Sequence, residues 1–302
     1  MGRRAMRATE VGEQAVESIE RQDWLDRIGG VLDGAIGGAF ERAGETGRRI
    51  KNFLHGTWLG HPLHPVLTDI PLGAFTAALV MDAIDRPRWN GGPGPYSAGA
   101  DAAIAVGVTG AAAAATAGLV DWHHTDDGAR RVGLVHGLLN TVALGLYATS
   151  LALRRSGNRP AGRALGYAGF AVMTASAYLG GTLVYRQRVG VDHSQRQRSS
   201  RFVPVLADSE LPAGTLRRVE VGQIRIVLVR RGDTIHALDE RCTHMGGPLS
   251  EGTLVDDAIT CPWHGSRFAL ADGRVLDGPA TAPQPCFETR VRNGMIEVRP
   301  AD

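Results

Sequence analysis

Two cysteines and two histidines near the end of the chain are spaced as ligands of a metal centre. Residues 242–266 read CTHMGGPLSEGTLVDDAITCPWHGS. Cys242 and His244 form a Cys-x-His arm, and Cys261 and His264 form a Cys-x-x-His arm after sixteen intervening residues. Thiolate sulfur and imidazole nitrogen are ligands of both zinc and iron–sulfur centres. The arrangement within the arms must therefore distinguish the two.

Each arm mixes the two ligand types, which favours an iron–sulfur cluster over zinc. Zinc fingers usually present two cysteines together and then two histidines, and zinc remains the alternative here. In a cluster with asymmetric ligands, one cysteine from each arm holds one iron and one histidine from each arm holds the other. Turn-forming residues after each arm would let backbone N–H groups approach the sulfurs; they are Gly246, Gly247, Pro248, Pro262 and Gly265.

With these residues in place, residues 202–302 resemble the Rieske family. The resemblance is carried by the Cys-x-His-x16-Cys-x-x-His signature, by GPL after the first arm, by HGS after the second and by the trailing VLDGPATAPQPCFETRV. It implies a [2Fe-2S] cluster in which Cys242 and Cys261 hold the iron that stays ferric. His244 and His264 would then hold the iron that changes oxidation state and lies nearest solvent.

The departures from the family pattern indicate a ferredoxin-like member. Respiratory members carry an extra cysteine in each loop, where this chain has Gly247 and Trp263, so the resemblance implies no bridging disulfide. Ser266 matches a cluster-tuning serine of those members, whereas Phe268 replaces a hydrogen-bonding tyrosine. Fewer donors predict a midpoint potential in the lower half of the roughly −150 to +300 mV Rieske range. The 38 residues after His264 contain no histidine, which excludes the catalytic iron site of Rieske oxygenases.

Four apolar stretches, roughly residues 65–84, 100–120, 132–153 and 164–185, precede this domain. Each is about 20 residues long, which is the length of a helix that crosses a bilayer. A soluble four-helix bundle, the alternative, would show a polar stripe on each helix. The small residues GAAAAATAG at 110–118 suit close helix packing in lipid. We therefore predict a multidomain fold, an all-α transmembrane four-helix bundle plus an all-β sandwich of the Rieske iron–sulfur protein type.

Histidines near the ends of these stretches are candidates for a second redox site. Residues 54–84, with HGLLN at His136, resemble a bacterial membrane-domain family of unknown function that is sometimes fused to a Rieske domain; the resemblance covers roughly residues 52–190. Ionisable groups within lipid are costly, and so each is a functional candidate. His64 and His136 are the tentative membrane-side redox site, holding a haem or lining a quinone pocket. The alternative is that both are structural, hydrogen-bonded histidines.

The chain is predicted to have four parts. Residues 1–51 form an amphipathic N-terminal segment, 52–190 the four-helix transmembrane domain, 191–200 a polar linker and 201–302 the Rieske domain. Short alternating runs such as IRIVLVRR, separated by Gly, Pro and Asp turns, indicate strands in the last part.

Charge and cysteine content limit the function and the location. A net charge of +2 gives no reason to expect a nucleic-acid partner. Three cysteines, two of them in ligand spacing, argue against a disulfide framework. An even number of spans places both termini on one side, and the missing secretory signal and flanking basic residues favour the cytoplasm. We expect a multi-pass protein of a bacterial inner membrane with a cytoplasmic cluster domain.

These observations predict a membrane-anchored one-electron transfer protein. It would pass electrons between a membrane donor, a quinone or a haem, and a soluble redox partner protein. No catalytic residue is predicted, and an electron-transfer component is favoured over a self-contained enzyme. The alternatives are a non-catalytic redox sensor and a ferredoxin that is merely tethered to the membrane and serves a separate oxygenase.

Overall fold

The computed structural model describes residues 8–86, 93–195 and 201–301, and these divide into two compact units. One unit, here called the helical unit, comprises residues up to 42 together with 63–189. The other, the cluster unit, comprises residues 43–62 together with those from 190 onward. The predicted linker, 191–200, lies partly outside the described residues, since 196–200 are not among them.

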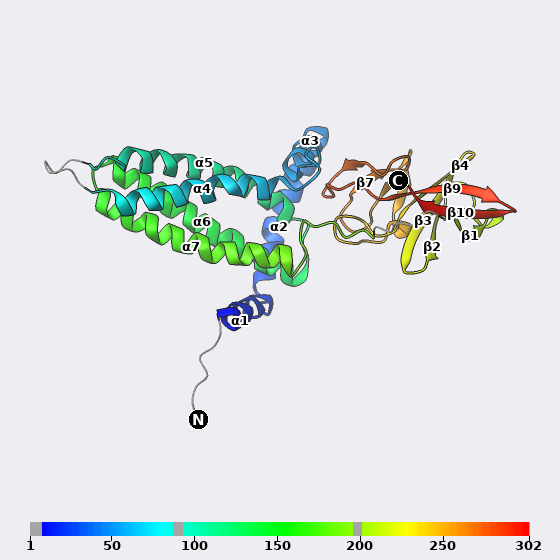
Figure 1. Cartoon of the computed structure of the whole chain (residues 1–302), viewed down its shortest axis with the longest axis horizontal. Helices are drawn as coiled ribbons and strands as arrows, with labels where there is room; N and C mark the ends of the chain where they lie inside the picture. The colour runs from blue at the N-terminus through cyan, green and yellow to red at the C-terminus, as the bar shows by residue number, and fades with distance from the viewer. Residues whose placement is uncertain (1–7, 87–92, 196–200, 302) are drawn as a thin grey trace, which may run out of the picture. The chain divides into compact units, whose positions relative to one another are not determined.

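Within the described residues, six helices build the helical unit (Figure 1). They are α1 (Ala8–Glu20), α2 (Leu25–Arg42), α4 (Leu63–Ile84), α5 (Ser97–Trp122), α6 (Asp127–Arg155) and α7 (Arg159–Tyr185). Helix α4 packs along α5, and α6 packs along α7. Small residues permit the close approach: a Cβ added to Gly110 on α5 would lie 2.6 Å from the Ile70 side chain on α4.

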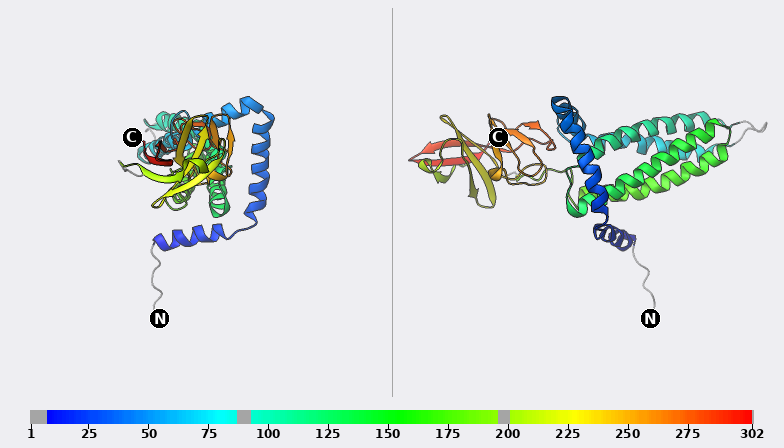
Figure 2. Two further views of the ribbon diagram at one scale, coloured as in Figure 1. Left: turned by 90° about the vertical axis from the view of Figure 1, so that its right-hand side faces the viewer. Right: turned by 180° about the vertical axis from the view of Figure 1, so that it is seen from behind.

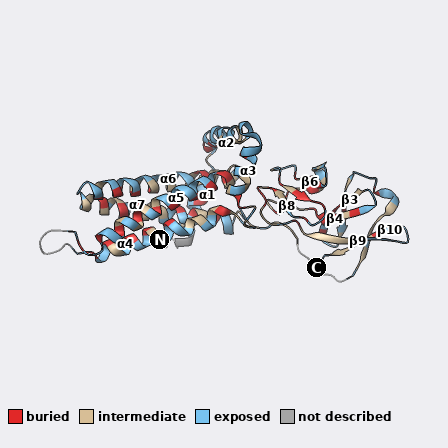
Figure 3. Cartoon of the chain, turned by 90° about the horizontal axis from the view of Figure 1, so that it is seen from above, coloured by how far each residue is buried: buried red, intermediate tan, exposed pale blue. Residues whose placement is uncertain are grey.

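Helices α4 to α7 are long and apolar enough to cross a membrane. Only 22 to 33 % of the residues in each apolar window are buried within the protein, and exposed residues run along the length of the helices (Figure 3). The apolar surface is therefore mostly directed outward, as lipid requires. The predicted four-helix bundle is confirmed, with each helix extending a few residues beyond its predicted apolar stretch.

Helix α2 contains the predicted amphipathic pattern and crosses near the end of α5 and the start of α6 (Figure 2). Its Asp33 carboxylate bonds the His123 ring and lies 3.1 Å from the Arg130 guanidinium. Ile28 and Val31 on the same helix are exposed. Leu25 and Ile36 of α2 pack in a cluster with Trp122 and Leu134 of the bundle, so α2 contacts the bundle through both polar and apolar side chains and leaves only part of its apolar surface uncovered.

The cluster unit contains two antiparallel sheets. The six-stranded sheet has the order β1-β10-β9-β4-β3-β2, and the four-stranded sheet the order β5-β6-β7-β8. The strands are β1 (Val203–Ala207), β2 (Leu216–Val221), β3 (Ile224–Arg231), β4 (Thr234–Asp239), β5 (Thr253–Val255), β6 (Ala258–Thr260), β7 (Arg267–Ala269), β8 (Val275–Asp277), β9 (Cys286–Arg292) and β10 (Met295–Pro300). Short 3-10 turns cover Asp208–Glu210 and Leu249–Glu251. The predicted all-β domain is confirmed.

One helix of the cluster unit comes from far earlier in the chain. Helix α3 (Gly44–His55) lies with the sheets, because Arg48 and Asn52 bond the carboxylate of Asp277 at the end of β8. The predicted boundary between residues 51 and 52 cuts through this helix. Local periodicity shows a helix but not its distant partner, so the sequence divided α3 between the N-terminal segment and the membrane domain.

Candidate metal centre

The first candidate loop follows β4 and is closed by two backbone hydrogen bonds around Cys242. Its N–H donates to the Gly247 carbonyl at 2.9 Å, and its carbonyl accepts from the Gly246 N–H at 2.8 Å. Gly246 has a φ of +78°, which side chains rarely allow. The glycine at 246 is thus required by the turn that folds the loop back on the cysteine.

The second loop, between β6 and β7, repeats the same turn around Cys261. Its N–H donates to the Ser266 carbonyl at 2.8 Å, and its carbonyl accepts from the Gly265 N–H at 3.2 Å. Gly265 has a φ of +75°. The two loops are therefore matched in hydrogen-bond register, each placing a cysteine at the start of the turn and a left-handed glycine four residues later.

Both cysteine side chains are buried, and backbone donors surround their sulfurs. Four N–H groups bond the sulfurs, those of His244 and Met245 at Cys242 and those of Trp263 and His264 at Cys261. The two thiols also bond each other, which raises the pKa of Cys242 and lowers the pKa of Cys261 to about 7. N–H donors stabilise sulfur as a thiolate or as a metal-bound ligand.

The two histidines form a second pair. The ring centroids of His244 and His264 are 4.9 Å apart, with the rings at 87° to each other. Burial, followed by the nearby His264, lowers the pKa of His244 to about 3. Its imidazole is therefore neutral at physiological pH, which is the form that ligates metals.

The four side chains fit a two-iron cluster better than a single ion. Over the described residues, no three His, Cys, Asp or Glu side chains converge as ligands of one ion. The sulfurs instead form one pair and the imidazoles another, as two irons with two protein ligands each require. All three cysteines are free, and a Cβ at Gly247 would lie 2.8 Å from the Cys261 sulfur, so no larger residue fits there.

Ser266 and Phe268 lie beside the second loop. Ser266 is fully buried, and its Oγ accepts the Ala280 N–H at 3.0 Å, which leaves the hydroxyl proton to be donated elsewhere. Phe268 is also fully buried, within the apolar core next to the two cysteines. The position of the expected tyrosine is thus occupied by a core residue without a hydroxyl.

Gln284 braces the first loop and was not predicted. Its buried amide donates to the carbonyls of Asp239 and Arg241, both at 2.7 Å, and accepts the Thr243 N–H at 3.1 Å. One side chain thereby holds the backbone at three positions around the start of the turn. The only signal in the sequence is its place in the proline-rich return segment.

In the helical unit, the structure brings His64 and His136 together. Their ring centroids are 6.4 Å apart, with the rings at 89°. His64 Nδ1 bonds the Ala114 carbonyl at 2.8 Å, and His136 Nδ1 bonds the Ser176 carbonyl at 2.9 Å. A carbonyl only accepts, so both Nδ1 atoms carry a proton, and in a neutral imidazole the lone pair is then on Nε2.

The surroundings of the two histidines repeat between the helix pairs. A glycine lies four residues after each accepting carbonyl, and it leaves room for the ring. A Cβ at Gly118 would lie 2.7 Å from His64 Nδ1, and one at Gly180 would lie 3.0 Å from His136 Cε1. The sites differ at Nε2, because Asn140 Nδ2 lies 3.1 Å from that atom of His136.

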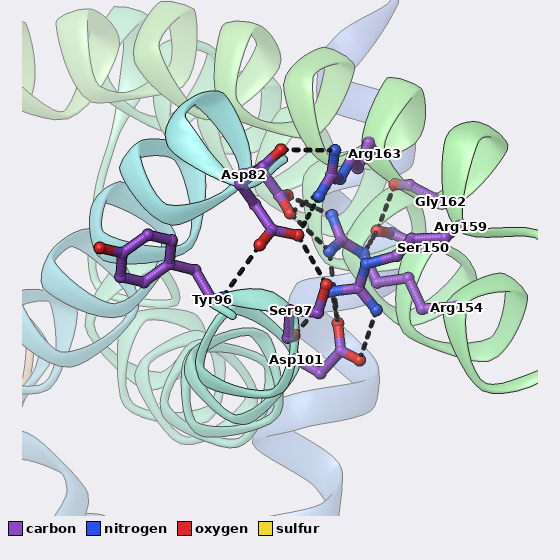
Figure 4. A network of polar contacts seen from close by, with 10 residues as sticks. Asp82, Tyr96, Ser97, Asp101, Ser150, Arg154, Arg159, Gly162 and Arg163 are labelled. Carbon is purple, nitrogen blue, oxygen red and sulfur yellow. Dashed lines mark hydrogen bonds and ion pairs between the residues drawn. The ribbon is translucent and has the colours of Figure 1, made fainter. Parts of the chain in front are cut away.

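A network of three aspartates and three arginines joins the other ends of the same helices (Figure 4). The side chain of Arg154 is fully buried; it bonds both carboxylate oxygens of Asp82 and lies 3.3 Å from Asp101. Arg159 bonds Asp101 at 2.9 Å, and Arg163 bonds the Asp85 carboxylate. No local pattern in the sequence predicts this network, although Asp82 and Asp101 lie within the predicted apolar stretches and were a signal.

Comparison with known proteins agrees with both units. The Rieske [2Fe-2S] domain family matches residues 201–288, and a family described as predicted membrane protein (DUF2231) matches residues 60–193. The chain belongs to the Rieske [2Fe-2S] proteins, and the part that precedes its Rieske domain matches the family of predicted membrane proteins.

Its relatives include small ferredoxins. Ferredoxin CarAc of Metapseudomonas resinovorans is 40% identical over 98 residues, 32% of this chain and 92% of that protein. The 3-phenylpropionate/cinnamic acid dioxygenase ferredoxin subunit of Escherichia coli (strain K12) is 35% identical over 89 residues, 29% of this chain and 83% of that protein. A solved complex of reduced oxygenase and oxidized ferredoxin in carbazole 1,9a-dioxygenase contains a chain that is 39% identical. That match covers 33% of this chain and 94% of that chain, with a TM-score of 0.31.

Proposed function

We propose that the chain is a membrane-anchored one-electron carrier. Its [2Fe-2S] cluster is held by the sulfurs of Cys242 and Cys261 and by the imidazoles of His244 and His264. The observation that supports this most is the pair of matched turns, which set two buried thiols in contact and two imidazoles 4.9 Å apart. The cluster, when bound, supplies a site that gains or loses one electron without transfer of atoms.

The residues around the site set the conditions for that transfer. Backbone N–H groups neutralise part of the charge on the sulfurs, and Ser266 has a hydroxyl proton left to donate toward the cluster as a tuning residue. Phe268 donates nothing, which favours a midpoint potential in the lower half of the Rieske range. No catalytic side chain is assigned, and the chain is a carrier rather than the catalytic subunit of an oxygenase.

The soluble partner in this proposal is a redox protein. Two relatives that match over most of their length are ferredoxins, one of them named as a subunit of a dioxygenase. Trp263 is 56 % exposed and its ring centroid lies 6.4 Å from that of His264. This exposed aromatic next to a cluster ligand is a suitable contact for such a partner.

On the membrane side, His64 and His136 form the proposed redox site. Two Nε2 lone pairs suit a haem iron or the hydroxyls of a quinol, and the carbonyl bonds at Nδ1 orient both rings. The amide of Asn140 would have to move from His136 Nε2 for a ligand to bind there. The four spans cross a bacterial inner membrane in this proposal, with the cluster unit in the cytoplasm.

Visible and electron paramagnetic resonance spectra of the full-length protein in detergent test the cluster. We expect two irons and two acid-labile sulfides per chain and a paramagnetic signal that appears on reduction. Cys242→Ser should abolish the signal, while Cys286→Ser, outside the two loops, should retain it. A colourless, zinc-loaded protein without labile sulfide would overturn the assignment.

The tethered ferredoxin is the second candidate, because the similarity to ferredoxins covers 92% of CarAc. His64→Ala and His136→Ala separate the two candidates. A carrier fed from the membrane should lose electron transfer from membrane donors, whereas a tethered ferredoxin should keep its activity with soluble donors and acceptors unchanged. The same preparations show whether a haem Soret band is present.

A further inference from the structure

Helix α3 is bound to the cluster unit by a clamp on one carboxylate. Asp277, at the end of β8, accepts hydrogen bonds from Arg48 and from Asn52 Nδ2, the latter at 2.9 Å. Its other oxygen accepts from Arg267 at 3.0 Å. The Asn52 Oδ1 in turn accepts the Gly278 N–H at 3.0 Å. The amide of Asn52 thus bonds two consecutive residues and fixes both the position and the rotation of α3.

The end of α3 is held as firmly as its middle. Gly56, with a φ of +81°, donates its N–H to the carbonyls of Asn52 and Phe53. The Thr57 hydroxyl bonds the same Asn52 carbonyl at 3.1 Å. The last turn of the helix therefore ends in a closed cap directly after His55.

His55 is directed into the cluster unit. Its side chain is fully buried, and a Cβ added to Gly278 would lie 3.1 Å from His55 Cδ2. Two residues further on, the Ala280 N–H bonds the hydroxyl of Ser266 in the second ligand loop. The His55 imidazole is also close enough to His244 to act on it electrostatically. The segment that carries Gly278 thus lies between α3 and the candidate centre.

We propose that helix α3 is part of the iron–sulfur site, with His55 excluding water from the His244 side and Asn52 as the positioning residue that holds it there. This inference rests on the cluster assignment above but not on the membrane-side redox site. Two ferric irons, two sulfides, two thiolates and two neutral imidazoles have no net charge, and reduction adds one negative charge. Excluding water disfavours the charged state, so α3 lowers the reduction potential of the cluster.

Redox titration of full-length protein in detergent, followed by electron paramagnetic resonance, tests this. Asn52→Ala should release α3 and raise the ratio of reduced to oxidised cluster at a fixed ambient potential, by roughly threefold to tenfold. A tenfold change corresponds to about 59 mV for one electron. Arg49→Ala is the matched control, because Arg49 is exposed on the same helix and bonds Glu45; it should leave the ratio unchanged.

Hydrogen exchange of the α3 amides gives a second readout that needs no redox activity. Asn52→Ala should accelerate exchange over residues 48–55, whereas Arg49→Ala should not. Accelerated exchange with a wild-type potential would make α3 a structural anchor only and overturn the proposal. Unchanged exchange would show that Asn52 does not hold the helix, which overturns it as well.

Two substitutions of His55 isolate the exclusion of water. His55→Ser opens the space beside His244 and should raise the potential as Asn52→Ala does. His55→Phe fills the space with a somewhat larger apolar ring that also excludes water, and it should leave the potential close to that of the wild type. Equal shifts in both variants would contradict water exclusion as the mechanism. Absence of any cluster in the wild-type protein would instead refute the proposed function. Hydrogen exchange would still show whether Asn52 holds α3 against the cluster unit.

Discussion

Two carboxylates, one in each unit, are buried to a similar degree but find different partners. Asp82 in the helical unit is 5 % exposed and pairs with the guanidinium groups of Arg154 and Arg163. Asp239 in the cluster unit is fully buried and accepts backbone N–H groups, from Arg241 at 2.7 Å and from Gln195 at 2.9 Å. A buried carboxylate is thus stabilised by side-chain cations in the helical unit and by backbone N–H groups in the cluster unit.

The difference follows from secondary structure. Within a helix the backbone N–H groups are already bonded to carbonyls, so a buried carboxylate among four helices must be neutralised by side chains. Loops between short strands leave N–H groups unused, and these are available to Asp239 and also to the two cysteine sulfurs. Asp239 in the cluster unit therefore accepts backbone donors, whereas Asp82 in the helical unit pairs with arginines.

The largest effect is expected from Arg154→Leu, which leaves Asp82 without its main partner in the bundle. Breaking a buried ion pair by removing one member costs about 3–5 kcal/mol. Thermal unfolding in detergent, followed by circular dichroism of the helices, measures the loss. The double variant Asp82→Leu/Arg154→Leu should recover much of it.

Arg155→Leu is the control for this pair, because Arg155 is the exposed neighbour in sequence. A single Arg154→Leu variant as stable as Arg155→Leu would show that the bundle does not depend on the pair. The two buried carboxylates would then differ in their bonding partners, but the Asp82–Arg154 pair would not contribute measurably to stability.

Because Asp239 is buried, we expect the stability of the cluster unit to depend on pH. Burial raises the pKa of this carboxyl to about 6 from a usual 3.8. The folded state therefore keeps a proton that the unfolded state has lost, and stability falls as pH rises from about 4 to about 6, then stays level. The loss is up to about 3 kcal/mol. Denaturant unfolding at several pH values measures it.

Asp239→Asn should remove this pH dependence, since the amide does not titrate. Asp272→Asn, at an exposed position, should keep the wild-type profile. A wild-type protein whose stability rises between pH 4 and 6, and does so equally in Asp239→Asn, would show that the backbone donors keep this carboxyl ionised.

The smallest effects concern the glycines beside the two histidines of the helical unit. Gly118→Ala would place a methyl group 2.7 Å from His64 Nδ1, and Gly180→Ala one 3.0 Å from His136 Cε1. Displacing the rings from their carbonyl partners should cost about 1–3 kcal/mol, with Gly118→Ala the larger. Gly145→Ala on α6 meets nothing within 4 Å and should be neutral or slightly stabilising. Equal stability of all three variants would refute the tight fit of the rings.

The features that could be predicted from sequence are those with a short repeat or a fixed spacing. Apolar runs of about 20 residues indicated α4 to α7, and alternation indicated strands such as β3. The Cys-x-His and Cys-x-x-His arms indicated two related loops. Each of these signals lies within a few dozen consecutive residues.

The features that escaped prediction depend on partners far apart in the chain. Asn52 and Asp277 are 225 residues apart, and Asp82 and Arg154 are 72 apart. Gln284 bonds backbone atoms of the first loop, and because every residue has these atoms, the residue types of the loop do not reveal the contact. The ring centroids of His64 and His136 lie 6.4 Å apart, but the carbonyl bonds of the two rings depend on where α5 and α7 pack.

One further consequence follows from the contact between Pro62 and Gly190. A Cβ at Gly190 would lie 3.5 Å from Pro62 Cγ, so the chain leaves the cluster unit before α4 and re-enters it after α7 at nearly the same point. Helices α4 to α7 are therefore an insertion within the sequence of the cluster unit. Excising residues 63–189 and bridging the gap with a few glycines should yield a water-soluble ferredoxin that retains helix α3. A truncation starting at Arg201 would discard it.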